Sequence, residues 1–152
     1  MIEPTPEAPV RDVVDAVRTL ARLTRFIDRA SDSLSSADYR VMSAIVEGEA
    51  RASRLANRLL LGKPAISSTV ESLSKRGLIV KSSVEGDNRA VELALSDEGA
   101  ELFARMEARM TDQLERLAAA TPNPDQVLQS LNWLGDAIEA TMQARATEGA
   151  SA

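Results

Sequence analysis

One stretch of the sequence, residues 63–99, restricts the fold more than any other. It opens with "KPAISSTVESLSKRGLI", in which Ile66, Val70 and Leu73 recur at intervals of three or four residues, as the buried face of a helix does. Gly77 follows, and glycine is favoured where a helix ends in left-handed backbone. The pattern predicts a helix that is closed at Gly77 and leads without a linker into the next element.

That next element has the pattern of a β-hairpin. Two short runs alternate apolar and polar residues on either side of Gly86, Asp87 and Asn88, which are residue types that favour turns. We expect the alternation to bury three side chains against the helices: Val91, Leu93 and Leu95. Arg89 is then exposed at the tip, where the Asp87 carboxylate can orient its guanidinium group. An arginine presented in this way can enter the minor groove of DNA.

Two more helices are predicted before residue 63. "LSSADYRVMSAIVEGE" begins with a capping box formed by Ser35 and Asp38, and "RASRLANRLLL" predicts a short helix over residues 51–61. We expect these helices to direct the following side chains inward: Tyr39, Met42, Ile45, Val46, Ala52, Leu55 and Leu59. Because only a very short turn separates residues 51–61 from the next helix, the pair reads as a helix-turn-helix, and the hairpin is its wing.

The outer face of the helix over residues 63–76 is polar. Its side chains are those of Lys63, Ser67, Ser68, Glu71, Ser72 and Lys75. Small hydroxyl side chains are poor helix formers and poor core residues, and they suit close approach to a surface rich in donors and acceptors, such as base edges. The alternative interpretation is an ordinary solvated helix face.

Long amphipathic helices flank this core, so the predicted fold is mostly α with a small β-hairpin wing. Residues 10–31 form an N-terminal dimerisation helix, residues 35–96 the winged helix-turn-helix lobe, and residues 97–145 two C-terminal dimerisation helices. The flanking segments, residues 1–9 and 146–152, are expected to be disordered. The apolar faces of the long helices are too extensive for one small core to cover, so we expect a homodimer.

Composition excludes several classes of function. The chain has 152 residues and contains neither cysteine nor histidine, which removes disulfides, thiol chemistry, the usual zinc sites and histidine-based catalysis. No nucleophile, glycine-rich phosphate loop or metal-binding set accompanies its carboxylates, so we expect no enzyme activity, no cofactor and no metal. No segment approaches the roughly 18 uncharged residues that a membrane helix needs, and we expect a cytoplasmic protein without membrane contact.

The distribution of charge favours a polyanionic partner although the net charge is −5. Residues 51–95 contain eight lysines and arginines and four acids, a local net charge of +4, whereas the remaining residues contain ten basic and nineteen acidic side chains, a net charge of −9. A chance difference between solvated faces would produce the same asymmetry. Charge alone therefore does not distinguish a DNA-binding surface from an ordinary solvated one.

From residue 10 to 145 the order of elements resembles that of the MarR family of winged-helix regulators. The resemblance is most specific in "SLSKRGLIVKSSVEGDNRAVELALSDEG", which contains an Arg-Gly-Leu helix end at residues 76–78, an Asp-x-Arg wing at residues 87–89 and a Leu-Ser-x-x-Gly junction at residues 95–99. The chain departs from the family pattern at three positions: Leu60 in place of the turn glycine, Gly62 in place of a hydroxyl cap, and Ser68 in place of an arginine.

The resemblance implies a homodimeric repressor that binds pseudo-palindromic double-stranded operator DNA and is released by a small, often phenolic, effector. It places the helix over residues 63–76 in the major groove and Arg89 in the flanking minor groove. The predicted DNA-binding residues are Arg51, Ser53, Arg54, Lys63, Pro64, Ala65, Ser67, Ser68, Thr69, Ser72, Arg76, Lys81, Asp87, Asn88 and Arg89. Tyr39 and Met42 are the predicted effector contacts. The competing hypothesis is a winged-helix protein-interaction module that does not bind DNA.

Overall fold

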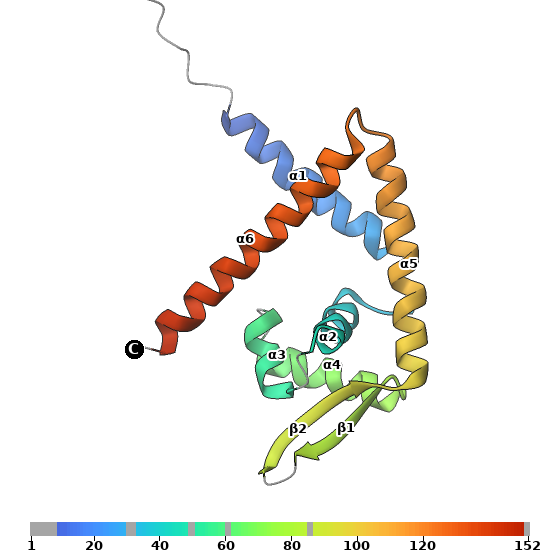
Figure 1. Cartoon of the computed structure of the whole chain (residues 1–152), viewed down its shortest axis with the longest axis vertical. Coiled ribbons are helices and arrows are strands. Elements are labelled where there is room, and N and C mark those ends of the chain that lie inside the picture. Colours follow the sequence, from blue (N-terminus) through green and yellow to red (C-terminus); the bar gives the residue numbers. More distant parts are fainter. Residues whose placement is uncertain (1–8, 30–32, 49–50, 60–61, 85–86, 151–152) are drawn as a thin grey trace, which may run out of the picture.

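The computed structural model describes residues 9–29, 33–48, 51–59, 62–84 and 87–150, and within these ranges the side chains of 9–11, 27, 52, 53, 57, 83, 84, 87–90 and 145–150 are outside the description. Helices α2 (Ser36–Val46), α3 (Ala52–Leu59) and α4 (Lys63–Lys75) form a small lobe with the hairpin of β1 (Ile79–Val84) and β2 (Asp87–Leu95), drawn at the bottom of Figure 1. Helix α5 (Asp97–Ala119) rises from this lobe, and α1 (Pro9–Asp28) and α6 (Pro124–Ala150) both contact α5. The mostly helical fold with one two-stranded antiparallel sheet is the predicted fold class.

The first described helix, α1, spans Pro9–Asp28, and α2 spans Ser36–Val46. The capping box expected at the start of α2 is confirmed: the Ser35 hydroxyl accepts from the Asp38 backbone N–H at 3.1 Å, and the Asp38 carboxylate accepts from the Ser35 N–H at 2.9 Å. These reciprocal bonds satisfy backbone groups that no helical partner can reach. The start of α2 is therefore defined by two side chains three residues apart.

The core of the lobe lies where α2, α3 (Ala52–Leu59) and α4 (Lys63–Lys75) converge above the hairpin. Its fully buried side chains are Val41, Met42, Leu55 and Leu73. The predicted inward residues of α4, Ile66 and Val70, are also buried, and Leu59 packs partly against them. Burying this apolar face against a common core sets α4 in one orientation, with its polar face outward.

Val46 corrects one prediction about this core, because its side chain is 57% exposed. Helix α2 ends at Val46, and Met42 and Ile45 already occupy the inward positions of its last turns. Val46 is four positions after Met42 and so on the same side of the helix, but it is the last residue of α2 and lies past the end of the packed face.

The junction between α4, the hairpin and α5 (Asp97–Ala119) is closely packed. Gly77 has φ +71°, the left-handed backbone expected at this helix end. The Ser96 hydroxyl caps α5 by accepting from the Gly99 N–H at 3.0 Å, and it also donates to the Gly77 carbonyl at 2.6 Å. Together with the Ser96 N–H, which donates to the Leu78 carbonyl at 3.1 Å, these contacts connect the end of α4 to the start of α5.

The wing consists of β1 (Ile79–Val84) and β2 (Asp87–Leu95), paired antiparallel from Ile79 opposite Leu95 outward. The pairing changes register at its end: Ser83 pairs with Val91, but Val84 pairs with Asp87. Residues 88–90 of β2 therefore have no partners in β1. Asp87 and Asn88, which the sequence pattern assigned to the turn, belong to β2.

Burial of the wing follows the predicted alternation only in part. Leu93 is buried and Leu95 packs partly against the core, whereas Val91 is 39% exposed. Val91 is farther from the helices along β2, where it lines a groove with Ile66 and Val70 of α4. The expectation of full burial was therefore wrong for this residue.

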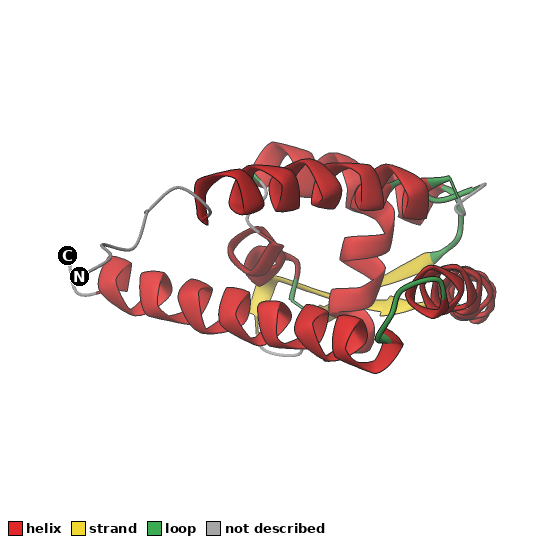
Figure 2. Ribbon diagram, turned by 90° about the horizontal axis from the view of Figure 1, so that it is seen from above, coloured by secondary structure: helices red, strands yellow, loops and turns green. Residues whose placement is uncertain are grey.

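Helices α5 and α6 (Pro124–Ala150) complete the chain. Viewed from above, α5 is seen end-on, and α1 and α6 extend from it toward the same side (Figure 2). Helix α6 continues through Ala150, so the first five residues of the segment 146–152, for which we expected disorder, are helical. Ala146, Glu148 and Ala150 are good helix formers and favour this extension, although Thr147 and Gly149 are not.

Candidate nucleic-acid interface

Helix α4 presents a polar face to solvent. Gly62 occupies its N-cap without a side-chain hydrogen bond, Pro64 lies in its first turn, and Lys63 and Ala65 are exposed there. The predicted contact residues Ser67, Ser68 and Ser72 are exposed as well. Thr69 is half-buried, and its hydroxyl donates to the Ala65 carbonyl at 2.9 Å within the helix. The three serine hydroxyls are the small polar groups that this face offers to a partner.

The charges on this face are linked through Glu71. Its carboxylate pairs with Lys81 of β1 at 2.9 Å and with Lys75, one helical turn further on, at 3.7 Å. The hydrogen bond and charge of Lys81, with a smaller effect from Lys75, lower the pKa of Glu71 below its ordinary value. Glu71 is therefore ionised at neutral pH and connects α4 to the wing.

Arg76 is engaged within the lobe. Its guanidinium group donates to the Asp38 carboxylate at 3.1 Å and to the Ser33 backbone carbonyl at 2.6 Å. Asp38 is the capping residue of α2 and is buried. Arg76, predicted from the sequence as a DNA contact, thus joins the end of α4 to the start of α2 and keeps a partly exposed side chain.

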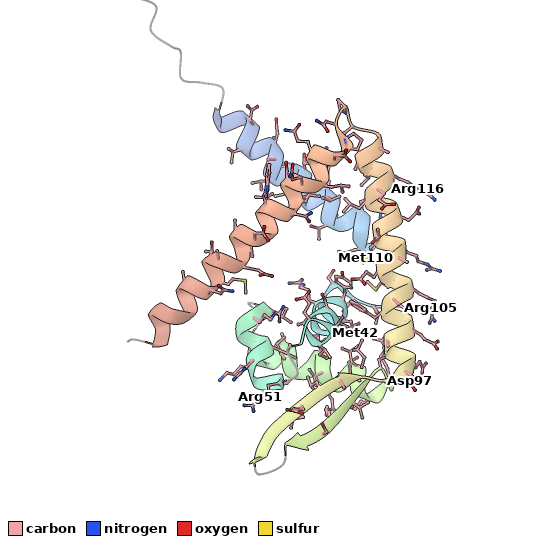
Figure 3. The ribbon with its side chains drawn as sticks, viewed as in Figure 1. Met42, Arg51, Asp97, Arg105, Met110 and Arg116 are labelled. Atoms are coloured by element: carbon pink, nitrogen blue, oxygen red, sulfur yellow. The ribbon has the colours of Figure 1, made fainter. Side chains whose placement is uncertain are left out.

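The predicted contacts near the start of α3 lie beside the wing. Arg51 is exposed, and its backbone forms an isolated bridge with Glu92 of β2 (Figure 3). Arg54 is also exposed and lines a cavity between α3 and α6. The Ser53 side chain lies outside the described part of the structure. This bridge brings the start of α3 to the same side of the lobe as β2.

At the wing, the backbone of Asp87, Asn88 and Arg89 is described and belongs to β2. The side chains of these three residues lie outside the description, so the predicted pairing of Asp87 with Arg89 stays a prediction. Asn88 and Arg89 belong to the insertion at residues 88–90, at the end of the hairpin farthest from α5.

A second concave region lies between the lobe and α6. It has a volume of about 860 Å³ and is lined by side chains from α2, α3 and α6, among them Tyr39, Arg54, Arg58 and Ile138. Tyr39 stacks on Phe103 of α5 with ring centroids 5.4 Å apart. Burial, and secondarily the negative charge of Glu107, raises the pKa of the Tyr39 phenol.

The two predicted effector contacts differ in accessibility. Tyr39 lines this cavity, but Met42 is 0% exposed and lies inside the core of the lobe (Figure 3). Met42 belongs to the buried core with Val41 and Ile45, whereas Tyr39, three residues earlier in α2, is only partly buried. In the described structure only Tyr39 of the two is accessible to a molecule in the cavity.

Sequence reasoning overlooked the role of Glu71 and the contact partners of Arg76. The spacing of Glu71 and Lys75 is a recognisable helical ion-pair signal. Lys81 and Glu71 are ten positions apart in the sequence, and Arg76 and Asp38 are 38 positions apart. Each pair joins two different elements, and the sequence does not reveal how those elements pack. Among the described residues there is no cluster of three or more potential metal ligands, and no described helix is long and apolar enough to span a membrane.

Comparisons with known proteins agree on one family. Residues 32–90 match the MarR family model. The chain is 28% identical over 100 residues to the HTH-type transcriptional regulator PecS of Dickeya dadantii (strain 3937), a match that covers 59% of this chain and 60% of that relative's length. Residues 32–90, which match the family model, include α2, α3, α4 and β1 and the first residues of β2.

Solved structures share the fold over most of the chain. A MarR-family transcriptional regulator from Rhodococcus sp. RHA1 superposes with a TM-score of 0.70 at 20% identity, covering 90% of this chain and 96% of that one. The PcaV transcriptional regulator of Streptomyces coelicolor, solved with its natural ligand, gives a TM-score of 0.62 at 22% identity, covering 91% and 100% of the two chains. The family model, PecS and these two structures all describe regulators and not enzymes, as expected from the sequence.

Proposed function

Because this chain belongs to the MarR family, we propose that it is a homodimeric transcriptional repressor, which binds a pseudo-palindromic operator in double-stranded DNA and leaves it when a small organic effector binds. Its proposed place is the cytoplasm, where that DNA lies. The observation that carries the proposal is the polar outer face of α4, fixed by the buried Ile66, Val70 and Leu73 and adjoining the wing.

The dimensions of DNA suit this arrangement. The major groove is about 12 Å wide and admits one α-helix, whose exposed side chains then meet base edges. On α4 these side chains include Ser67, Ser68 and Ser72, whose hydroxyls both donate and accept hydrogen bonds. The wing extends from the same lobe, which supports contact between residues 87–89 and the adjacent minor groove.

Dimerisation is supported by apolar side chains that the isolated chain exposes on its long helices. They include Val13, Val17 and Leu20 on α1 and Trp133, Leu134 and Ile138 on α6, each between 47% and 63% exposed. Such a surface is unusual for a monomer, and a second copy would remove it from water. Two copies related by a twofold axis would also present two α4 helices to the two halves of a palindrome.

For the effector we propose a weakly acidic aromatic molecule in the cavity between the lobe and α6. Tyr39 would contact its ring, and the guanidinium group of Arg54, which lines the same cavity, would attract a carboxylate or phenolate, whereas that of Arg58 pairs with Glu47. The solved complex of the related PcaV with its natural ligand supports small-molecule control. A panel of phenolic acids tests this: one or more should raise the melting temperature, and no shift from any member would contradict the proposed ligand class.

The experiment on DNA binding replaces Arg89 by alanine. Operator affinity should fall by about 1–3 kcal/mol, because one cation at the minor groove is lost, while the melting temperature stays nearly unchanged. Arg105→Ala is the matched control: it also removes one positive charge, but from the face of α5 that points away from the lobe (Figure 3). Equal operator affinity for Arg89→Ala and the wild type would contradict the proposed role of the wing.

A further inference from the structure

Glu71 is the only acidic residue in α4, and it lies on the face that the proposed function turns toward DNA. A carboxylate there is repelled by phosphate, and desolvating it at an interface costs free energy. The rest of this face consists of serines and lysines. The position of Glu71 is therefore unfavourable for DNA binding unless its charge has a separate use.

The contacts of Glu71 indicate that use. One carboxylate oxygen pairs with the Lys81 ammonium at 2.9 Å, and the other lies 3.7 Å from the Lys75 ammonium. The side chains of Lys75 and Lys81 are 75% and 35% exposed, so both ammonium groups are close to solvent and could otherwise reach a phosphate. The three side chains together carry a net charge of +1 instead of the +2 of two unpaired lysines.

Phosphate contacts supply nearly all of the affinity of a protein for DNA of arbitrary sequence, whereas contacts with base edges supply discrimination. A carboxylate that pairs with Lys75 and Lys81 therefore weakens phosphate contacts much more than contacts with base edges. On the basis of the proposed DNA-binding function, we infer that Glu71 is a specificity-determining residue, which pairs with Lys75 and Lys81 and thereby suppresses binding to non-operator DNA.

The test compares Glu71→Gln with the wild type on two duplexes: DNA from upstream of the protein's own gene, and a duplex of the same length with scrambled sequence. Affinity is measured at several salt concentrations. Glu71→Gln should bind the scrambled duplex several-fold more tightly, with a plot of log affinity against log salt that is steeper by about 1 for each lysine that gains a phosphate. The ratio of operator to scrambled affinity should fall.

Two further variants separate this effect from a general change in charge. Glu101→Gln removes one negative charge and breaks an exposed pair with Arg105, 3.6 Å away on α5, so it should leave the salt slope and the affinity ratio at wild-type values. Glu71→Gln combined with Lys75→Gln should return the slope toward that of the wild type. A double variant that stays as steep as Glu71→Gln would contradict release of Lys75.

The outcomes distinguish this inference from the function on which it rests. A wild-type protein that binds neither duplex overturns the proposed function and this inference together. A wild-type protein that prefers the upstream duplex, combined with a Glu71→Gln variant of unchanged salt slope and ratio, overturns the inference alone. The same slope change in Glu101→Gln would also overturn it, because the effect would then follow from net charge and not from the pairing on α4.

Discussion

Gly99 shows how a single residue positions the lobe of α2–α4 and the hairpin on α5. A Cβ atom at this position would lie 1.9 Å from the backbone carbonyl oxygen of Leu78, a contact that no side-chain movement relieves. Gly99→Ala should therefore reduce the free energy of unfolding by about 1–3 kcal/mol, the usual cost of overpacking. Gly135→Ala is the control, because no described atom lies within 4 Å of its added Cβ. Thermal unfolding of both variants measures the difference, and equal melting temperatures would contradict this packing.

Arg76 stabilises the lobe, although its position at the end of α4 suggested a DNA contact. Arg76→Ala leaves the Asp38 carboxylate, which is buried, without its cationic partner, so stability should fall by about 1–3 kcal/mol. Arg105→Ala breaks a solvent-exposed pair with Glu101 and should cost at most about 1 kcal/mol. Chemical denaturation compares the two. Arg76→Ala with wild-type stability but weaker DNA binding would identify Arg76 as a DNA contact after all.

Tyr39 gives a titration signal of its own, because it is the only tyrosine in the chain. Burial and Glu107 raise its pKa in the folded protein, so the folded state holds the phenolic proton to higher pH than the unfolded state does. Stability linked to Tyr39 is thus constant below the unfolded pKa of about 10 and falls as the pH rises above it. Ultraviolet absorbance of tyrosinate should give a pKa above that of the denatured chain. An equal or lower value would contradict the burial of this side chain.

At the scale of elements, local sequence signals predicted the helix ends of the lobe well. Ser35, Gly77 and Ser96 act through backbone groups within a few residues, so their effect is visible in the sequence. The shift of register in the wing and the exposure of Val91 depend on how the strands pair and where the helices end. Such tertiary details leave no periodic signal, and the same holds for the pairing of Lys81 with Glu71.

In the proposed function, α4 is the element on which the preference for particular DNA sequences should depend. Ser68→Ala removes an exposed hydroxyl from the outer face of α4 and leaves the buried face of the helix unchanged. We expect it to change the ranking of operator variants more than the affinity for random DNA, because base contacts specify and phosphate contacts position. Binding to a library of operator variants measures this ranking. An unchanged ranking would contradict base reading by Ser68.

For the whole molecule, the exposed apolar side chains of α1 and α6 predict that the chain of 16.3 kDa sediments at twice that mass at micromolar concentration. Leu134→Lys puts a charge into this surface and should shift the equilibrium toward monomers, because an unpaired charge is costly to bury. Gln129→Lys, an equal change of charge at an exposed polar position of the same helix, should have a smaller effect. Wild-type protein that sediments only as a monomer would contradict dimerisation through these helices.

The salt dependence of DNA affinity is the most direct test of the proposed function, because the chain as a whole has a net charge of −5 whereas residues 51–95 have a net charge of +4. Wild-type protein is titrated with the duplex from upstream of its own gene and with a scrambled duplex at several salt concentrations. We predict tighter binding to the upstream duplex and a slope of log affinity against log salt of about −4 or steeper, which corresponds to four or more neutralised phosphates. No binding to either duplex, or a flat salt response, would contradict a DNA-binding regulator and favour a winged-helix module that binds another protein.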